Sequence, residues 1–491
     1  MALDDLGRIV GEANFTKNPA ALQEYCEGKG GCVPRALVRP ASTEEVQRIV
    51  EWANDTRALL VPVSSGPPHI HGGSTPSVEG AVVVDLRRMD KVIRVDKNNR
   101  VVIVQPGVTF GHLQTELARQ GLSAYLPLLP RPTKSVLASV LEREPILMPS
   151  VHFDSTDPLL CAEIVFGTGD RMRTGEAAGP DTLEEQWEIG KAQISPFGPT
   201  QMDPQRLVSG AQGTIGIVTW VSLKCRQRSD EARAFFLPSE DLDALVELSY
   251  HLCRIRYTGT ILLLDRVNLA RMAQRTPREI HGLQCALPNW VLFVAYEGYG
   301  LLPEEKLKYL EEDLRESASS YGLEPVTDLA GLPGEALYRL LLGPSSQPYW
   351  KLRSHGGFRD VFFITTQDKT PYFAKRMRKL ARRFGFPTQQ LGMYMQPVVQ
   401  GTSCHLEFNL YFDPTDLTGV KRLRRLEAAA VDRLEREGAF FARPYPGWAE
   451  AAYRGYPDTA AMQRKVKAIF DPNWVLNPGK LCFPPGSGRQ D

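Results

Sequence analysis

Glycine and proline are concentrated in a few short segments, and the longest of these limits how the N-terminal part of the chain can fold. The sequence holds 41 glycines and 37 prolines among 491 residues. A segment rich in both, Ser64–Pro76, separates the apolar runs Leu59–Val63 and Ala81–Leu86, which look like short buried strands. Glycine lets a main chain turn through positive φ and approach a ligand, so this segment suits a pyrophosphate bound by backbone N–H groups. A plain β-hairpin or Ω-loop is the alternative interpretation.

The rest of the chain alternates strands and helices and changes character near residue 228. A helix is predicted over 42–60, with Ser42 or Thr43 as its cap, and hairpins are predicted at 92–105 and 162–174. Beyond the polar stretch Arg226–Arg233, longer strand and helix units follow one another. We therefore expect an α+β chain with one domain over residues 1–228, a second over 229–457, and a C-terminal segment, 458–491, that returns to the first.

Composition and charge exclude several classes of protein. Lys and Arg total 58 and Asp and Glu total 57, so the net charge of +1 gives no overall field to attract nucleic acid. No apolar run approaches the roughly 20 residues that a membrane-spanning helix needs. The first residues carry Asp4, Asp5 and Arg8 without an apolar core, which argues against a secretory signal and for a cytoplasmic protein.

Cysteine and histidine spacing gives no metal site. The eight cysteines are scattered and none forms a C-x-x-C pair, so neither a zinc ribbon nor a redox dithiol is indicated. His69 and His71 lie two residues apart without a third ligand nearby. We interpret them as loop histidines beside an organic ligand.

Four segments in a fixed order carry a resemblance that covers nearly the whole chain. They are the Gly66–Gly73 loop with its following strand, Val104–Thr109, Gly213–Thr219 and Asp471–Lys480. In this order and spacing the chain resembles the vanillyl-alcohol oxidase superfamily, flavoproteins with an FAD domain of the p-cresol methylhydroxylase type. The stretch from Arg173 to Pro199 is most similar to the phenol-oxidising branch. The resemblance implies a two-subdomain FAD-binding domain and an α+β cap domain with an antiparallel sheet.

The resemblance also implies which residues bind FAD, and it shows two departures. The segment Arg131–Ser139 lacks the glycines that let relatives lay the main chain against the flavin, and Pro67 and Pro68 remove two N–H donors from the first loop. The position that tethers the flavin in many relatives is Asp360 here, so non-covalent FAD is predicted. The predicted FAD-binding residues are Ser64, Ser65, Gly66, His69, Gly72, Gly73, Pro106, Gly107, Lys134, Ser135, Gly216, Ile217, Val218, Asn477 and Lys480.

Four residues match positions where relatives carry catalytic groups. Asp154 corresponds to an active-site carboxylate, with a turn or helix-cap aspartate as the alternative, and Arg443 corresponds to an arginine that stabilises a phenolate. The tyrosines that bind the phenolate in relatives are replaced by Ala442 and His71, so His71 is expected to act as a donor. His405 begins a strand on which Glu407 and Asn409 share its face. This polar face predicts an active-site lining, with a structural histidine as the alternative.

The function implied by the resemblance is oxidation of a small aromatic alcohol or 4-alkylphenol, by hydride transfer to FAD. Two alternatives stay open: a 2-hydroxy-acid dehydrogenase of the D-lactate or glycolate type, and a flavin-free, non-catalytic partner subunit. Oxygen or a carrier protein such as a cytochrome would take the electrons, and the chain would be a homo-oligomer or a paired subunit. The basic run Lys375–Phe384 is interpreted as a solvated helix face, with docking of an acidic carrier as the alternative.

Overall fold

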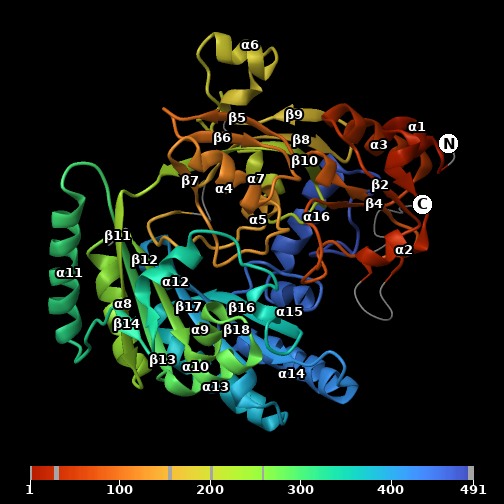
Figure 1. Cartoon of the computed structure of the whole chain (residues 1–491). Helices are drawn as coiled ribbons and strands as arrows, with labels where there is room; N and C mark the ends of the chain where they lie inside the picture. The colour runs from red at the N-terminus through yellow and green to blue at the C-terminus, as the bar shows by residue number, and fades with distance from the viewer. Residues whose placement is uncertain (1–2, 27–31, 153–156, 200–202, 257–258, 485–491) are drawn as a thin grey trace.

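The computed structural model describes residues 3–26, 32–152, 157–199, 203–256 and 259–484, and it has the predicted α+β class. Figure 1 shows two parts, one holding strands β1 to β10 and the other β11 to β18. The chain passes between them from β10, which ends at Gln227, to β11, which begins at Glu231. Ligand sites occur preferentially where domains meet, so we expect the functional site near the junction of these two parts.

A small sheet at the N-terminus holds the glycine-rich loop. Its strand order is β1-β2-β4-β3, and β4 pairs in parallel with both β2 and β3. The predicted helix is confirmed as α3, with the Ser42 hydroxyl accepting a hydrogen bond from the Glu45 N–H. The elements are α1 (Asp5–Val10), β1 (Phe15–Thr16), α2 (Pro19–Leu22), β2 (Ala36–Val38), α3 (Thr43–Thr56), β3 (Leu60–Val63) and β4 (Val82–Asp85). The loop Ser64–Pro76 leaves β3 at the edge that faces the second domain.

An antiparallel sheet forms the other half of the first domain. Its order is β5-β6-β10-β8-β9, with β7 paired to the end of β10, and both predicted hairpins are confirmed as β5–β6 and β8–β9. The strands are β5 (Val92–Asp96), β6 (Val101–Val104), β7 (Leu122–Ala124), β8 (Leu159–Phe166), β9 (Arg171–Arg173) and β10 (Gly216–Gln227). The helices are α4 (Phe110–Ala118), α5 (Val136–Leu141), α6 (Leu183–Glu188) and α7 (Gln205–Val208).

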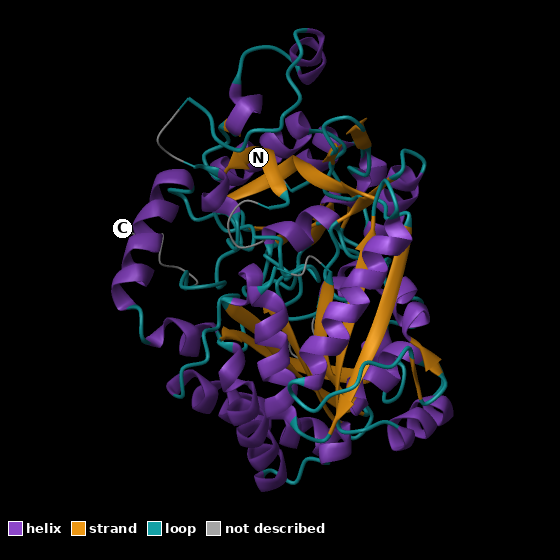
Figure 2. Cartoon of the chain, turned by 90° about the vertical axis from the view of Figure 1, so that its left-hand side faces the viewer, coloured by secondary structure: helices purple, strands orange, loops and turns teal. Residues whose placement is uncertain are grey.

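The second domain is built on one antiparallel sheet of order β11-β13-β12-β17-β18-β16. Its strands are β11 (Glu231–Ser239), β12 (Thr260–Asp265), β13 (Trp290–Gly298), β16 (Gly357–Thr365), β17 (Leu391–Val398) and β18 (Ser403–Phe412). Figure 2 shows helices lying against the long strands of this sheet. The helices are α8 (Leu242–Arg254), α9 (Arg266–Ala273), α10 (Pro277–Ala286), α11 (Pro303–Ser319), α12 (Gly334–Leu341), α13 (Thr370–Arg383) and α14 (Leu417–Arg436), with a two-stranded ribbon of β14 (Asp328–Leu329) and β15 (Leu332–Pro333).

Strand β18 explains how this sheet supports a polar site. Leu406, Phe408 and Leu410 belong to the apolar core on one face. The residues between them point to the opposite face, because side chains alternate along a strand. That face carries His405, Glu407 and Asn409, all of which are buried, so the predicted polar strand face is confirmed.

The C-terminal segment returns to the first domain after two further helices, α15 (Ala449–Arg454) and α16 (Pro457–Phe470). Leu476 forms a parallel bridge with Leu60 at the start of β3, and Leu60 N–H donates to the Val475 carbonyl at 2.7 Å. Lys467 Nζ, fully buried, donates to the Thr214 carbonyl and pairs with Asp471, both at 2.6 Å. These contacts hold the segment after α16 against the loop that precedes β10.

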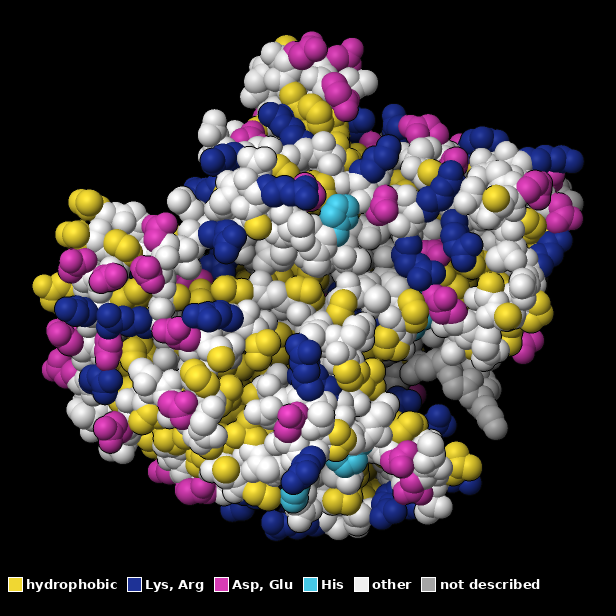
Figure 3. All heavy atoms as spheres, viewed as in Figure 1, with side chains coloured by type: hydrophobic (Ala, Val, Ile, Leu, Met, Phe, Trp, Pro, Cys, Tyr) yellow, Lys and Arg dark blue, Asp and Glu magenta, His cyan; other side chains and the backbone are white. Residues whose placement is uncertain are grey.

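The surface and the cysteines fit the composition. Figure 3 shows side chains of both charges interspersed over the face in view. The basic run forms α13, whose buried face includes the predicted Met377, Leu380 and Ala381, and Phe384 packs partly buried beside them.

All eight cysteines are free thiols. Within the described residues no helix is long and apolar enough to cross a membrane, and no three potential metal ligands cluster.

Candidate functional site

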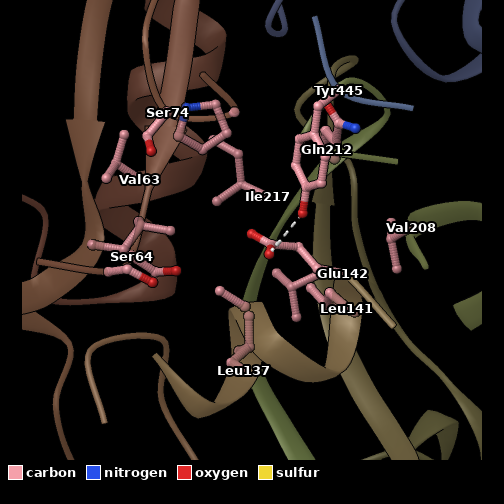
Figure 4. A pocket seen from close by; sticks show the side chains of 18 residues that line it. Val63, Ser64, Ser74, Leu137, Leu141, Glu142, Val208, Gln212, Ile217 and Tyr445 are labelled. Atoms are coloured by element: carbon pink, nitrogen blue, oxygen red, sulfur yellow. Dashed lines mark hydrogen bonds between the residues drawn. The ribbon is translucent and has the colours of Figure 1, made fainter. Parts of the chain in front are cut away.

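Two adjoining cavities, each of about 120 Å³, lie near the junction of the two domains: the first is within the first domain and is closed by Tyr445, and the second lies between the domains. They share Ser65, Gly73, Ser74, Glu142 and Tyr445 as a common wall. Figure 4 shows the first cavity, with Ser64 and Ser74 on one side, Leu137 of α5 below, and Tyr445 with Glu142 opposite. The shared lining residues place the two cavities side by side.

The first cavity has the features that an FAD molecule needs. Serine hydroxyls of the glycine-rich loop line it together with the start of β10, and Gln212 lines it from the loop before β10. Gln212 Nε2 donates to the Pro444 carbonyl at 3.0 Å, whereas its buried Oε1 has no partner among the described residues. A buried acceptor without a donor is costly, so this atom is ready to accept a hydrogen bond from a bound ligand. Six predicted FAD-binding residues line this cavity: Ser64, Ser65, Gly73, Gly216, Ile217 and Val218.

The glycine-free segment Arg131–Ser139 packs on the glycine-rich loop and leads into α5. Gly66 N–H donates to the Thr133 carbonyl at 2.9 Å. Ser135 caps α5: its hydroxyl accepts from Ala138 N–H and donates to the Pro106 carbonyl. Leu137, Ala138 and Leu141 of α5 then line the first cavity, so this segment gives the cavity aliphatic side chains where relatives have glycine nearby.

Eight of the fifteen predicted FAD-binding residues line neither cavity, and several of them contact the main chain near the cavities. Gly107 lies so close to the main chain that an added Cβ would be 2.4 Å from the Arg87 carbonyl oxygen. Lys480 Nζ donates to the Gly72 and Thr75 carbonyls at 2.6 Å, and Asn477 Nδ2 donates to the Gln212 carbonyl at 2.7 Å. The eight are Gly66, His69, Gly72, Pro106, Gly107, Ser135, Asn477 and Lys480.

The second cavity brings together three of the four predicted catalytic residues, His71, His405 and Arg443. The His71 ring stacks on Tyr445 at a centroid distance of 4.9 Å, and the Arg443 guanidinium lies 4.2 Å above the Phe362 ring centroid. Burial lowers the pKa of His71 well below its ordinary value and also lowers the pKa of His405, so both are neutral. The fourth predicted residue, Asp154, lies outside the described residues.

A buried charge cluster forms the floor of the second cavity. Lys351 Nζ lies 2.7 Å from Asp360 Oδ2 and also pairs with Glu407, and Tyr394 donates to Glu407 at 2.7 Å. Burial raises the pKa of Asp360 to about 7, with Lys351 opposing and Glu407 adding to the rise. Burial acts in the same direction on Glu407, but Lys351 and His405 hold its pKa well below its ordinary value. The cluster therefore holds one firmly ionised carboxylate and one that titrates near neutral pH.

A second ion pair lies where the two cavities meet. Lys134, predicted to contact phosphate, lines the second cavity instead of the first, and its ammonium pairs with Glu142 at 2.6 Å and with Glu144 at 3.1 Å. Burial would raise the pKa of Glu144, but Lys134 and Arg443 lower it to about 2. Glu142 in turn accepts a hydrogen bond from Tyr445 at 3.1 Å, shown in Figure 4. The contacts among Lys134, Glu142 and Tyr445 thus form the boundary between the two cavities.

Glu144→Gln is expected to lower the free energy of unfolding at pH 7 by about 2 kcal/mol. The folded-state pKa lies below that of the unfolded chain, so the stabilisation is complete above about pH 4.3 and is lost as the pH falls toward 2. Urea unfolding of the variant and the wild type at pH 7 and pH 3 measures the difference. The exposed Glu247→Gln is the control, and an equal loss at both pH values would contradict the assignment.

Several residues of the site were missed or left without a role by sequence reasoning. Lys351 stands in the run Tyr349–Leu352, and a single lysine among apolar residues is a signal of a buried, paired cation that could have been used. Gln212, Glu142 and Glu144 carry no such signal, because their roles depend on how separate segments pack together.

Comparisons with known proteins agree with this geometry. Residues 34–174 match the family model described as the FAD binding domain, and residues 449–481 match that of the C-terminal domain of FAD linked oxidases. The first range contains the glycine-rich loop and the helix α5, and the second contains α16 and the bridge to β3.

Similarity to single proteins extends over nearly the whole chain. The 4-cresol dehydrogenase [hydroxylating] flavoprotein subunit of Pseudomonas putida is 23% identical, with 91% of this chain and 87% of that protein covered. The D-2-hydroxyglutarate dehydrogenase of Stutzerimonas stutzeri is also 23% identical, with 98% of each covered. A solved structure of p-cresol methylhydroxylase with substrate bound superposes with a TM-score of 0.83 at 19% identity, over 98% of this chain and 96% of that one. The chain is therefore an FAD-linked oxidoreductase with the p-cresol methylhydroxylase type of FAD-binding fold.

Proposed function

We propose that the chain oxidises a small phenolic compound, a 4-alkylphenol or a 4-hydroxybenzyl alcohol. The observation that carries this proposal is the set of contacts that the Arg443 guanidinium makes. This group lines the second cavity, stacks on Phe362, and forms no hydrogen bond or ion pair with any described residue. Arginine stays charged and presents a planar set of donors, so a partly buried guanidinium without a hydrogen-bond acceptor favours an anionic oxygen of a ligand, although Glu144 lies close enough to interact with its charge.

The walls of the second cavity favour an aromatic body behind that oxygen. Phe362, Tyr445 and the neutral His71 ring offer flat apolar faces close to Arg443. A phenolate bound there places its charge on the guanidinium and its ring among the aromatic side chains. Burial, with the neighbouring Glu142, raises the pKa of Tyr445 well above its ordinary value, so this phenol stays protonated and donates its hydrogen bond to Glu142.

The residues of the site would activate the substrate by holding it as a phenolate. When bound in the first cavity, FAD supplies the acceptor for a hydride from the benzylic carbon, which is attached to the ring para to the phenol oxygen. Arg443 lowers the cost of ionising the phenol, and electron release from the phenolate weakens that C–H bond. The role of a water-activating base is assigned to Asp154, which stays a prediction.

A 2-hydroxy acid is the second candidate, because Arg443 would also bind a carboxylate and a neutral histidine could accept the hydroxyl proton. The similarity to D-2-hydroxyglutarate dehydrogenase adds to the case for testing it. We prefer the phenol because the aromatic side chains of the second cavity would contact its ring, whereas a small hydroxy acid has no ring for them to contact. The electron-carrier partner and the pairing of subunits stay predictions.

Anaerobic bleaching of the flavin absorbance tests the proposal directly. Purified holoprotein is mixed with 4-cresol, 4-hydroxybenzyl alcohol, benzyl alcohol, D-lactate or D-2-hydroxyglutarate. We expect bleaching by the first two and not by benzyl alcohol, a matched control that lacks only the phenol hydroxyl. Bleaching by a hydroxy acid alone would transfer the assignment to the second candidate. Equal rates with benzyl alcohol and 4-hydroxybenzyl alcohol would refute phenolate activation.

A further inference from the structure

A third cavity, of about 710 Å³, lies behind the flavin pocket and takes no part in the proposed substrate site. It is bounded by the loop before β10, by the segment 440–444 that precedes α15, and by the helices α15 and α16. Five aromatic side chains line it: Phe440, Phe441, Tyr453, Tyr456 and Phe483. Its size and its walls match those of a small-molecule site.

A single layer of polypeptide chain separates the third cavity from the flavin pocket. Val208 at the end of α7 and Gln212 in the loop after it line the flavin pocket, whereas their neighbours Leu207 and Ala211 line the third cavity. On the other side, Tyr445 lines the flavin pocket and its neighbour Pro444 lines the third cavity. The Gln212 side chain joins these two walls through its hydrogen bond to the Pro444 carbonyl. A ligand here therefore sits next to the cofactor.

The lining suits a flat ring that carries carbonyl oxygens. Phe440 and Tyr456 stand at the mouth, with ring centroids 6.4 Å apart at an interplanar angle of 72°, and they are 51% and 48% exposed. An electron-poor ring gains from contact with such aromatic faces, and the half-exposed mouth leaves room for it to enter and leave. Arg143 and Arg206 also line the cavity, where Arg143 Nη2 donates to the Ala442 carbonyl and Arg206 Nε to Asp203, both at 3.0 Å, and their positive charge favours carbonyl oxygens nearby.

We propose that the third cavity binds a quinone, which accepts the electrons released when the substrate is oxidised. The quinone ring takes two electrons, and each of its two carbonyl oxygens takes one proton, giving the hydroquinone. The two electrons and two protons come from the reduced flavin, which returns to its oxidised form. The proposal rests on FAD in the adjoining pocket and is independent of which substrate reduces it.

Binding is measured first, without turnover. A fully substituted quinone, 2,3-dimethoxy-5,6-dimethyl-1,4-benzoquinone, is titrated calorimetrically into oxidised holoprotein, because it has no free ring position for a thiol to attack. We expect one site per chain. Phe440→Ser/Tyr456→Ser should weaken binding about tenfold by removing the mouth aromatics. Ile469→Ser, on the exposed side of α16 at 66% exposure and outside the cavity, is the matched control and should bind as the wild type does.

Electron transfer is measured second, with the flavin reduced by dithionite so that no substrate is needed. Mixing with the quinone in a stopped-flow instrument should reoxidise the flavin at a rate that saturates, and the double variant should slow this about tenfold. Reoxidation by ferricyanide, which needs no aromatic slot, should be equal in both proteins. Absence of saturable quinone binding, or equal quinone rates in both proteins, would overturn the proposal. So would a dimer that the double variant dissociates, because the cavity would then be a subunit interface.

Discussion

Arg443→Ala is expected to slow bleaching of the flavin by a 4-alkylphenol about 10²- to 10³-fold while FAD remains bound. The guanidinium stacks on Phe362 in the second cavity and does not line the flavin pocket, so the loss falls on the reacting substrate and not on the cofactor. Arg443→Lys should recover part of the rate, because a lysine keeps the charge but loses the planar set of donors. Arg454→Ala, which breaks surface ion pairs with Asp432 and Glu435, is the control.

The pH profile separates this chemical role from a structural one. If Arg443 stabilises the phenolate, the variant should regain rate as the pH approaches about 10, where a phenol ionises without help. A collapsed site would stay slow at every pH. Stopped-flow bleaching between pH 6 and 10 measures both curves. Parallel curves for the variant and the wild type would show that Arg443 does not act on the ionisation of the substrate.

Local patterns in the sequence were enough to predict the framework of the fold. The Ser42 cap and the apolar spacing after it predicted α3, and the period-two pattern of 405–409 predicted a polar strand face, because both depend on neighbours along the chain. The order of the glycine-rich segments predicted the FAD-binding domain, and the match of residues 34–174 confirms that cofactor. The alternative of a flavin-free subunit is therefore not supported.

Contacts between distant segments were beyond the reach of those patterns. Lys134 was predicted to contact a phosphate, which stays a prediction; its ammonium pairs with Glu142, which lines both cavities, and with Glu144 in the second. The sequence showed that glycine is missing at 131–139, but not that Ser135 caps a helix whose aliphatic side chains line the first cavity. Both features depend on how separate segments pack together, which local patterns do not show.

The cluster of Lys351, Asp360 and Glu407 connects the stability of the second domain to the chemistry of the site. Two carboxylates and one ammonium lie buried together, and Asn409 Nδ2 bridges the two carboxylates with hydrogen bonds of 2.6 Å to each. A buried set of this kind is costly to break, because removing one member leaves an uncompensated charge away from water. Lys351 also keeps Glu407 ionised beside His405, and this carboxylate orients the His405 ring within the cavity.

Lys351→Met, which keeps the length of the side chain and removes its charge, is expected to lower the free energy of unfolding at pH 8 by about 3–5 kcal/mol. Without the ammonium the pKa of Glu407 rises above its unfolded value, so the folded variant binds extra protons and becomes more stable as the pH falls toward 5. In the wild type Glu407 gives no such gain, because its pKa is held low and it stays ionised over this range. The gap in stability between the two should therefore narrow between pH 8 and pH 5, as measured by urea unfolding of both proteins.

A double variant separates charge from packing in this prediction. Lys351→Met/Glu407→Gln should be more stable at pH 8 than Lys351→Met alone, because the second change removes the stranded carboxylate, while the exposed Lys375→Met should leave stability unchanged. If the two losses simply add, the cluster is not an interacting charge set and Lys351 acts through packing alone. Recovery in the double variant would show that the buried lysine is kept to neutralise the acidic floor of the site. The proposed binding of a phenolate depends on that neutralisation, because unpaired carboxylates beneath the substrate would repel its charge.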